Sequence, residues 1–279
     1  MEQAGADSRV DLAAYAARLG YDGVLEPSVE TVRALHRLHT AAIPFENLST
    51  LLGETPRLDV ASLERKLVLS RRGGYCFEQN RLFGAVLETL GLKVAGLAAR
   101  VRWEREPGAD VPRTHMLLLV DIAGEPYIAD VGFGGLTLTA PLRFAPQLEQ
   151  RTPHETFRLR RADAGFVLEA KLSSDWRELY WFDETLHMPI DFEVFNHFVA
   201  TYPRSPFRSM LYGARVLPDR RLGLRNGRFT VRGLDGSGET RELETVSALR
   251  RVLTEEFAIT LPDDDALSDV LEQVLEPGE

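Results

Sequence analysis

The spacing of apolar residues changes near residue 92, and this change restricts the fold more than any other feature of the sequence. Before residue 90, apolar residues recur every three or four positions, as in amphipathic helices. From 93 to 183 they form short runs separated by turn-rich pieces such as "EPGAD" and "AGEP". The pattern predicts an α+β protein whose middle strands form an antiparallel sheet or barrel.

Three stretches of the first region carry helix start or stop signals. The amphipathic stretch 11–20 ends on Gly20, and Ser28 is a candidate N-cap for the helix that follows. The segment "CFEQNRLFGAVLETLGL" gathers apolar residues on one side and ends with Gly91 as a candidate cap. Cys76, its first residue, is therefore expected near a helix N-terminus.

The middle and last regions predict strands with a few helices. The predicted middle strands are 93–103, 114–122, 126–133, 156–161, 165–172 and 177–183, followed by a helix at 190–202. In the last region, Asn226-Gly227 predicts a hairpin turn. Further elements are expected there as strands near 228–233 and 239–244 and helices near 245–257 and 263–275.

The overall composition is that of a globular protein, because 44% of the 279 residues are hydrophobic. Acidic residues outnumber basic ones by 42 to 33, and the net charge of -9 argues against a nucleic-acid partner. No apolar run approaches the roughly 18 residues that span a bilayer. The polar start "MEQAGADSRV" lacks a signal-peptide core. The sequence predicts a cytoplasmic protein with no membrane partner.

Cys76 is the only cysteine, which excludes an internal disulfide and a metal site built from several cysteines. It stands in "SRRGGYCFEQN", behind two arginines and two glycines. Helix N-termini and nearby cations stabilise a thiolate. Gly73 and Gly74 let backbone N–H groups approach the sulfur, where they could hold an oxyanion. Two interpretations stay open here: a reactive nucleophile, or a small buried side chain beside a tight turn.

A cysteine nucleophile needs a base, and the base needs an orienting acceptor. His115 opens the apolar strand "MLLLV", and Asp130 ends another strand before a glycine-rich turn. Polar groups entering a core need partners, and a buried carboxylate is costly unless it is paired. The other histidines are weaker candidates: His36 and His39, surface or partly buried on a helix; His154 and His187, in loops; and His197, on a helix packed between domains.

A plain hairpin between these two strands does not bring Asp130 to His115. If "AGEP" is a four-residue turn, Asp130 lies opposite Leu119. The two side chains then face the same side but stand four residues apart, roughly 13 Å along a strand. A bulge, the loop that carries Asp130, or pairing with other strands would have to close this gap.

Three motifs resemble the arylamine N-acetyltransferase family. They are "RRGGYCFEQN", "THMLLLV" and "DVGFGG", with 39 residues from the cysteine to the histidine and 15 from the histidine to the aspartate. The stretches "IPFENLS" (43–49) and "FNHFVATYPRSPF" (195–207) also look like family segments. The likeness covers most of residues 30–210.

The resemblance implies three domains. These are a helical domain over 1–90 that carries the nucleophile, an antiparallel β-barrel domain over 91–200, and an α/β lid over 201–279. It also implies a Cys-His-Asp arrangement like that of the cysteine proteases.

The same resemblance implies a catalytic triad of Cys76, His115 and Asp130, with no metal. In such enzymes acetyl-CoA acylates the cysteine and CoA leaves. An arylamine, arylhydroxylamine or hydrazine then takes the acetyl group, so the kinetics are ping-pong.

Further site residues follow from the resemblance. The residues implied in CoA binding are Thr114, Phe133, Gly134, Gly135 and Thr137. An acceptor pocket is expected at Phe45, Trp103 and Phe133, and Glu46 and Arg72 are expected to pair and brace the cysteine loop.

Three other functions remain open from the residues themselves. A cysteine hydrolase or transglutaminase-like enzyme would use the same triad on amides. An amide synthase of the same family would close a macrolactam from a carrier-bound thioester. A non-catalytic binding module would leave Cys76 inert.

Overall fold

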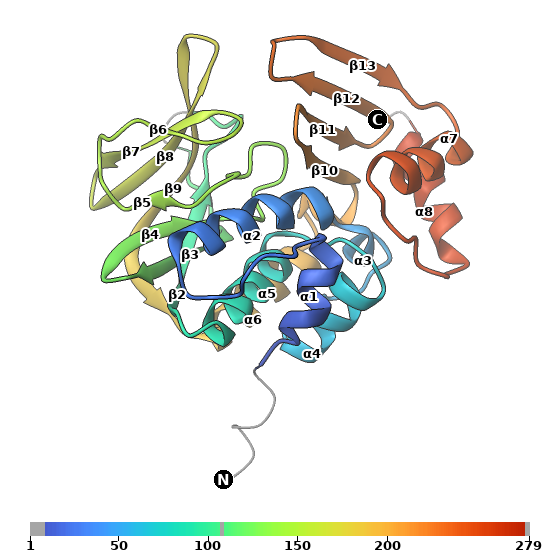
Figure 1. Cartoon of the computed structure of the whole chain (residues 1–279). Coiled ribbons are helices and arrows are strands. Elements are labelled where there is room, and N and C mark those ends of the chain that lie inside the picture. Colours follow the sequence, from blue (N-terminus) through green and yellow to red (C-terminus); the bar gives the residue numbers. More distant parts are fainter. Residues whose placement is uncertain (1–8, 107–108, 277–279) are drawn as a thin grey trace.

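The computed structural model describes residues 9–106 and 109–276, in three parts that follow one another along the chain (Figure 1). The predicted "EPGAD" turn lies partly outside these residues. The helices of the first part are α1 (Leu12–Leu19), α2 (Val29–Ala42), α3 (Leu48–Leu51), α4 (Val60–Leu63), which continues as a π-helical segment (Glu64–Leu69), and α5 (Cys76–Thr89). Ser28 caps α2 by accepting from Thr31 N, and the left-handed Gly20 ends α1, as predicted.

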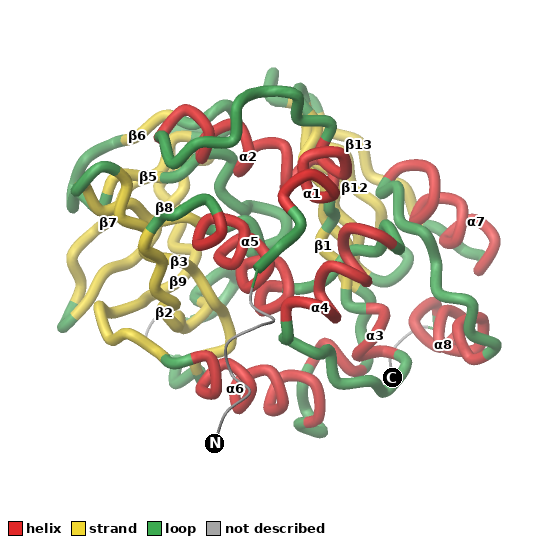
Figure 2. The backbone as a smooth tube through the Cα atoms, turned by 60° about the horizontal axis from the view of Figure 1, so that its bottom comes forward, coloured by secondary structure: helices red, strands yellow, loops and turns green. Residues whose placement is uncertain are grey.

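Helix α5 is enclosed between the other helices and the middle sheet (Figure 2). It contacts α4 on one side and strands β2 (Lys93–Val101) and β3 (Arg113–Ile122) on another. The fully buried apolar residues of α5 include Phe77, Leu82, Phe83, Val86 and Leu87. Because tight packing fixes the position of this helix, it also fixes the position of its first residue.

The middle part is an eight-stranded antiparallel sheet in the order β5-β4-β3-β2-β9-β8-β7-β6. Its remaining strands are β4 (Glu125–Ala129), β5 (Leu142–Arg143), β6 (Gln150–Arg151), β7 (Thr156–Ala162), β8 (Gly165–Leu172) and β9 (Asp175–His187). The Gln150 side chain joins the two edge strands, since Oε1 accepts from Arg143 N at 2.8 Å and Nε2 donates to Arg143 O at 2.9 Å. The sheet therefore nearly closes into the predicted barrel.

The turn between β3 and β4 has two residues instead of the predicted four. Ile122 pairs with Glu125 across it, and both turn residues have the positive φ that such tight hairpins require. The predicted alignment of Asp130 with Leu119 is therefore wrong by two residues. The ladder extended beyond β4 sets Asp130 opposite Leu117.

The third part is a five-stranded sheet in the order β1-β10-β11-β12-β13, packed against helices. Its elements are β10 (Tyr212–Leu217), β11 (Arg220–Arg225), β12 (Arg228–Gly233), β13 (Gly238–Glu242), α7 (Val246–Arg251), the π-helical segment Val252–Glu256 and α8 (Ala266–Leu275). The Asn226-Gly227 hairpin is confirmed, whereas β10 and β11 were not predicted.

Two elements connect the parts. Helix α6 (Pro189–Thr201) follows the barrel as predicted and packs against β3. Strand β1 (Phe45–Glu46) belongs to the first part of the chain but pairs with β10, so it forms an edge of the third sheet. The α+β class is confirmed, and the domain limits at 90 and 200 stay predictions.

Candidate active site

Cys76 is the first residue of α5, as the sequence predicted. The preceding Tyr75 has an extended backbone, and its N–H donates to the Glu78 carboxylate at 3.1 Å, which fixes the first turn. Lys66 holds the other oxygen of Glu78 at 2.7 Å. The Cys76 thiol is 5% exposed and donates to Thr114 O at 3.6 Å. A cysteine at this position faces the unpaired N–H groups and positive end of a helix.

Gly73 and Gly74, which precede Tyr75 and Cys76, lie where neighbouring atoms leave no room for a side chain. A Cβ on Gly73 would lie 2.3 Å from Pro44 O, and a Cβ on Gly74 would lie 2.8 Å from the Glu78 carboxylate. Both distances are too short for any side chain. The glycines therefore let the cysteine loop lie directly against the segment that contains β1.

Glu46 and Arg72 form the predicted ion pair beneath this loop. Glu46 is fully buried, and its Oε1 lies 3.0 Å from an Arg72 guanidinium nitrogen. Its Oε2 accepts from Leu48 N at 2.6 Å. Burial favours the neutral acid, but Arg72, Lys66 and these hydrogen bonds together lower the pKa of Glu46. The carboxylate therefore stays charged and joins β1 to the cysteine loop.

Replacing Arg72 by methionine should lower the free energy of unfolding by about 3 kcal/mol or more, because it leaves a buried carboxylate without its main partner. Arg57→Met is the matched control. Arg57 also pairs with a carboxylate, but the two side chains are 77% and 44% exposed, so its loss should cost less than about 1 kcal/mol. Chemical denaturation of both variants measures the difference. Equal losses would show that Glu46 does not depend on Arg72.

His115 and Asp130 are in direct contact, with Nε2 to Oδ2 at 2.8 Å. His115 lies on β3 and Asp130 in the loop after β4. Since Asp130 continues the ladder opposite Leu117, it stands two residues, or roughly 7 Å, from His115 on the same face. The two side chains span this shorter distance. The four-residue turn predicted from the sequence would have prevented this contact, whereas the two-residue turn in the structure allows it.

Four donors surround the Asp130 carboxylate. Oδ2 accepts from His115 and from the Tyr180 hydroxyl at 2.9 Å. Oδ1 accepts from Asn80 Nδ2 and from Gly132 N, both at 2.9 Å. Asp130 is fully buried, so these bonds replace its lost hydration.

Sequence reasoning missed Asn80 and Tyr180. Asn80 follows Cys76 by four residues on the same helix, so the two share a face. That spacing is a signal which could have identified Asn80 as part of the site. Tyr180 lies on β9, far along the sequence, and no local pattern connects it with Asp130.

The His115 imidazole is favoured in its charged form. Burial alone would lower the pKa of His115, but the Asp130 carboxylate and the Cys76 thiol raise it from 6.5 to about 10. In the same way, burial would raise the pKa of Asp130, but His115, Asn80 and Gly132 lower it. An imidazolium next to a thiol stabilises the thiolate.

These shifts predict how the pair stabilises the fold at different pH values. A raised histidine pKa contributes stability that is fully present below the unfolded value of 6.5 and is lost as the pH rises through about 10. The difference in unfolding free energy between the native protein and His115→Gln should therefore be larger at pH 6 than at pH 10. Denaturant titrations at both pH values measure it. A constant difference would contradict a charged His115.

His36 and His39 are fully buried, so the prediction that they are surface or partly buried is wrong. His36 Nε2 accepts from Asp130 N at 3.3 Å, and burial lowers its pKa to about 3. His39 lies between Tyr15 and Gln79, and burial lowers its pKa to about 4. Both are neutral, and His36 supports the backbone of Asp130.

His197 is exposed, so its side chain takes no part in the packing of this helix. Its neighbour Asn196 does take part. The buried Asn196 side chain accepts from the Tyr75 hydroxyl and donates to Pro56 O at 2.8 Å. Helix α6 therefore anchors the residue directly before Cys76.

Comparisons with known proteins assign the chain to a family. A family model described as N-acetyltransferase matches residues 28–266. The arylamine N-acetyltransferase of Escherichia coli strain K12 is 43% identical over 250 residues, which cover 89% of each chain. A Salmonella typhimurium relative, named arylamine N-acetyltransferase / N-hydroxyarylamine O-acetyltransferase, is 41% identical over 253 residues and 90% of each chain. The chain belongs to the arylamine N-acetyltransferase family. It is therefore an acyltransferase.

Solved arylamine N-acetyltransferase structures share this fold. The Mycobacterium smegmatis enzyme superposes with a TM-score of 0.92 at 37% identity, covering 96% of this chain and 100% of the other. The Mycobacterium marinum enzyme in complex with CoA gives 0.91 at 38% identity, covering 95% and 99%. The predicted family and its α+β arrangement are confirmed.

Among the residues predicted to bind CoA, Phe133 lies beside the histidine and Thr137 beside the aspartate. Phe133 is half-buried with its ring edge-on to His115, at 5.2 Å between centroids. Gly134 has φ +82° and lies against the Phe45 ring, and the space around Gly135 is open. The buried Thr137 hydroxyl donates to Asp130 O at 2.9 Å, so this hydroxyl already uses its proton in a hydrogen bond within the loop.

Trp103 and Thr114 are both half-buried. The half-buried Trp103 packs against the barrel core, as Phe133 does. The half-buried Thr114 precedes His115 and offers its carbonyl to the Cys76 thiol. The CoA and acceptor roles predicted for these residues stay predictions.

Among 9–106 and 109–276, no group of three or more His, Cys, Asp or Glu side chains could hold a metal ion. In the same ranges, no helix is both long and apolar enough to span a bilayer. The cytoplasmic location stays a prediction.

Proposed function

We propose that the protein transfers an acetyl group from acetyl-CoA to an arylamine, arylhydroxylamine or hydrazine, by a ping-pong mechanism through an acetyl-cysteine at Cys76. The observation that carries the proposal is the chain of contacts from Cys76 through His115 to the buried Asp130 carboxylate. The names of the bacterial relatives support the acceptor class, and the M. marinum relative in complex with CoA supports the donor.

In the first half-reaction, the Cys76 thiolate attacks the thioester carbonyl of acetyl-CoA. The His115 Nε2 proton is held by Asp130, so Nδ1 is the nitrogen left for the thiol. Nδ1 already holds the proton given up by the thiol and donates it to the CoA sulfur as CoA leaves. Asp130 fixes the ring orientation and stabilises the imidazolium. The acetyl group moves from one sulfur to another at nearly equal free energy, so this step is reversible.

In the second half-reaction, the acceptor nitrogen attacks the acetyl-cysteine. His115 removes a proton from the attacking amine, and Cys76 leaves as a thiolate. The product amide is more stable than the thioester, so the reaction proceeds in this direction. In both steps the backbone N–H groups of the first turn of α5 stabilise the oxyanion.

The site residues near His115 fit the two substrates. Phe133 and Phe45 offer flat apolar surfaces to an aromatic amine and shield the acetyl-cysteine from water. The open backbone at Gly135 leaves room for the pantetheine chain of CoA.

His115→Ala should slow iodoacetamide alkylation of Cys76 at pH 7 by about 10-fold or more, because an unassisted thiol is only a few per cent thiolate at that pH. His197→Ala is the matched control, since His197 is exposed on α6 and should leave the rate unchanged. Mass spectrometry of the alkylated protein measures the rates. An unchanged rate in His115→Ala would remove His115 from the mechanism.

Intact-mass analysis after mixing with acetyl-CoA tests the whole proposal. We expect a gain of one acetyl group, its loss on addition of an arylamine, and no gain in Cys76→Ala. A gain of one acetyl group that persists in Cys76→Ala would show that another residue is the nucleophile. Release of the acetyl group to water at the same rate with and without arylamine would identify a hydrolase.

A further inference from the structure

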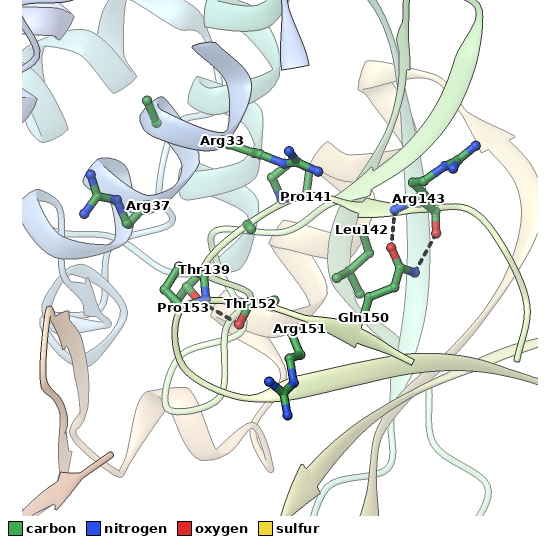
Figure 3. A pocket seen from close by; sticks show the side chains of 12 residues that line it. Arg33, Arg37, Thr139, Pro141, Leu142, Arg143, Gln150, Arg151, Thr152 and Pro153 are labelled. Carbon is green, nitrogen blue, oxygen red and sulfur yellow. Dashed lines mark hydrogen bonds between the residues drawn. The ribbon is translucent and has the colours of Figure 1, made fainter. Parts of the chain in front are cut away.

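A cavity of about 600 Å³ lies between α2 and the seam where the barrel closes (Figure 3). Arg33, Ala34 and Arg37 of α2 form one wall. Residues 139–143 and 150–153 form the others. None of these residues belongs to the triad or to the sets proposed for CoA and for the acceptor.

Four arginines line this cavity: Arg33, Arg37, Arg143 and Arg151. Its lining contains no aspartate or glutamate. Arg143 pairs with the exposed Glu125 at 3.0 Å. Within the described ranges 9–106 and 109–276, no salt bridge involves any of the other three.

This concentration of positive charge is unusual for the chain, whose net charge is -9. The acidic residues outnumber the basic ones, so carboxylate partners are plentiful elsewhere on the surface. The nearby Glu149 is directed to Lys171 at 3.5 Å instead of to Arg151. Three guanidinium groups are therefore left available around one cavity.

The walls of the cavity are held by their own hydrogen bonds. The Gln150 side chain bonds both ways with the Arg143 backbone, as Figure 3 shows. The buried Thr139 hydroxyl donates to Thr152 Oγ1 at 2.9 Å. These contacts position the walls without using the arginine side chains. Figure 3 also shows Arg33 extending from α2 toward Pro141, whereas Arg37 and Arg151 extend in other directions.

We propose that this arginine cavity binds a small molecule through a diphosphate group, toward which the exposed side chains of Arg33, Arg37 and Arg151 turn on binding. The planar guanidinium group donates two parallel hydrogen bonds to phosphate oxygens, and several such groups match a diphosphate better than a single carboxylate. The volume is in the range of small-molecule sites, and larger than a diphosphate alone requires. Ala34, Pro141 and Pro153 supply an apolar surface for an uncharged part such as a nucleoside.

Calorimetric titration of the full chain with ADP and with inorganic pyrophosphate tests this site. Both should bind at low salt, and more weakly as salt is added. ADP binding tighter than pyrophosphate would identify a nucleoside diphosphate as the ligand, and equal affinity would identify the diphosphate alone. Each result supports the site.

Charge-removing variants assign the binding to this cavity. The double variant Arg33→Gln/Arg37→Gln and the single variant Arg151→Gln should each weaken binding by about 10-fold or more, since each removes charge-assisted hydrogen bonds. Arg251→Gln is the matched control, because Arg251 is an exposed arginine of α7 outside the cavity. All these arginines are exposed, so the variants should keep the melting temperature of the native protein.

Three results would overturn the proposal: no binding of either probe, undiminished binding by the cavity variants, or an equal loss in Arg251→Gln. ADP bound at the acyl-donor site would give the second result. Binding is measured without acyl donor or acceptor. Failure here therefore leaves the proposed acetyl transfer standing, and failure of acetyl transfer leaves this site standing.

Discussion

Replacing Cys76 by serine should give a folded protein that acetylates arylamines roughly 10⁴-fold more slowly or worse, the scale seen when a triad nucleophile is removed. A hydroxyl is a far weaker acid than a thiol, so serine supplies far less of the charged nucleophile at neutral pH. In the native protein Asp130 and Cys76 together raise the pKa of His115 to about 10, and serine removes the contribution of the cysteine.

The fold should tolerate this serine. The serine hydroxyl can donate to Thr114 O, which now accepts from the thiol, and serine is close to cysteine in size. The melting temperature should stay within a few degrees. Initial rates with acetyl-CoA and an arylamine, together with a thermal melt, measure both effects. A variant that retained a tenth of the native rate would show that the sulfur is not the nucleophile.

Asp130→Asn should reduce both activity and stability. The asparagine amide would face donors from every side, because Tyr180, Asn80 and Gly132 all donate to the carboxylate together with His115. At least one donor would lose its partner, at a cost of about 1 to 3 kcal/mol or more. His115 would also lose the charge that holds its tautomer. The analogous change in a serine protease lowers the rate by about 10⁴-fold, and we expect a loss of at least about 10³-fold.

Asp121→Asn is the matched control for this prediction. Asp121 lies on the same strand as His115, and its carboxylate accepts from Gly124 N at 2.8 Å in an exposed turn. This change should cost less than about 1 kcal/mol and leave the rate within twofold. Denaturation curves and steady-state rates of both variants make the comparison. If Asp121→Asn and Asp130→Asn lowered the stability and the rate equally, the network around Asp130 would have no special role.

Local sequence signals were sufficient for the helix ends and for the helix start at Cys76. Ser28 and Gly20 marked helix ends because caps act within one turn. Cys76 was placed at a helix start by the pattern of the residues that follow it. The triad itself came from family motifs, since the residue pattern alone left the distance between His115 and Asp130 unexplained.

Long-range packing accounts for most of the errors. The burial of His36 depends on the loop after β4, ninety-four residues away, and α2 alone gives no sign of it. Tyr180 reaches Asp130 because β9 lies beside β2 in the barrel. The short β5 and β6 depend on closure through Gln150 instead of on strand propensity. The β3–β4 register changed by two residues because turn length, which sequence only suggests, determines it.

The pairing of β1 with β10 has a consequence for chimeric enzymes. Grafting the C-terminal sheet of a relative onto this chain would also replace β10, the strand that pairs with Phe45 and Glu46. Glu46 in turn holds the arginine beside the nucleophile loop. Such a graft must therefore transfer Phe45 and Glu46 together with the distant sheet, because the dipeptide and the sheet form one structural unit although 165 residues separate β1 from β10.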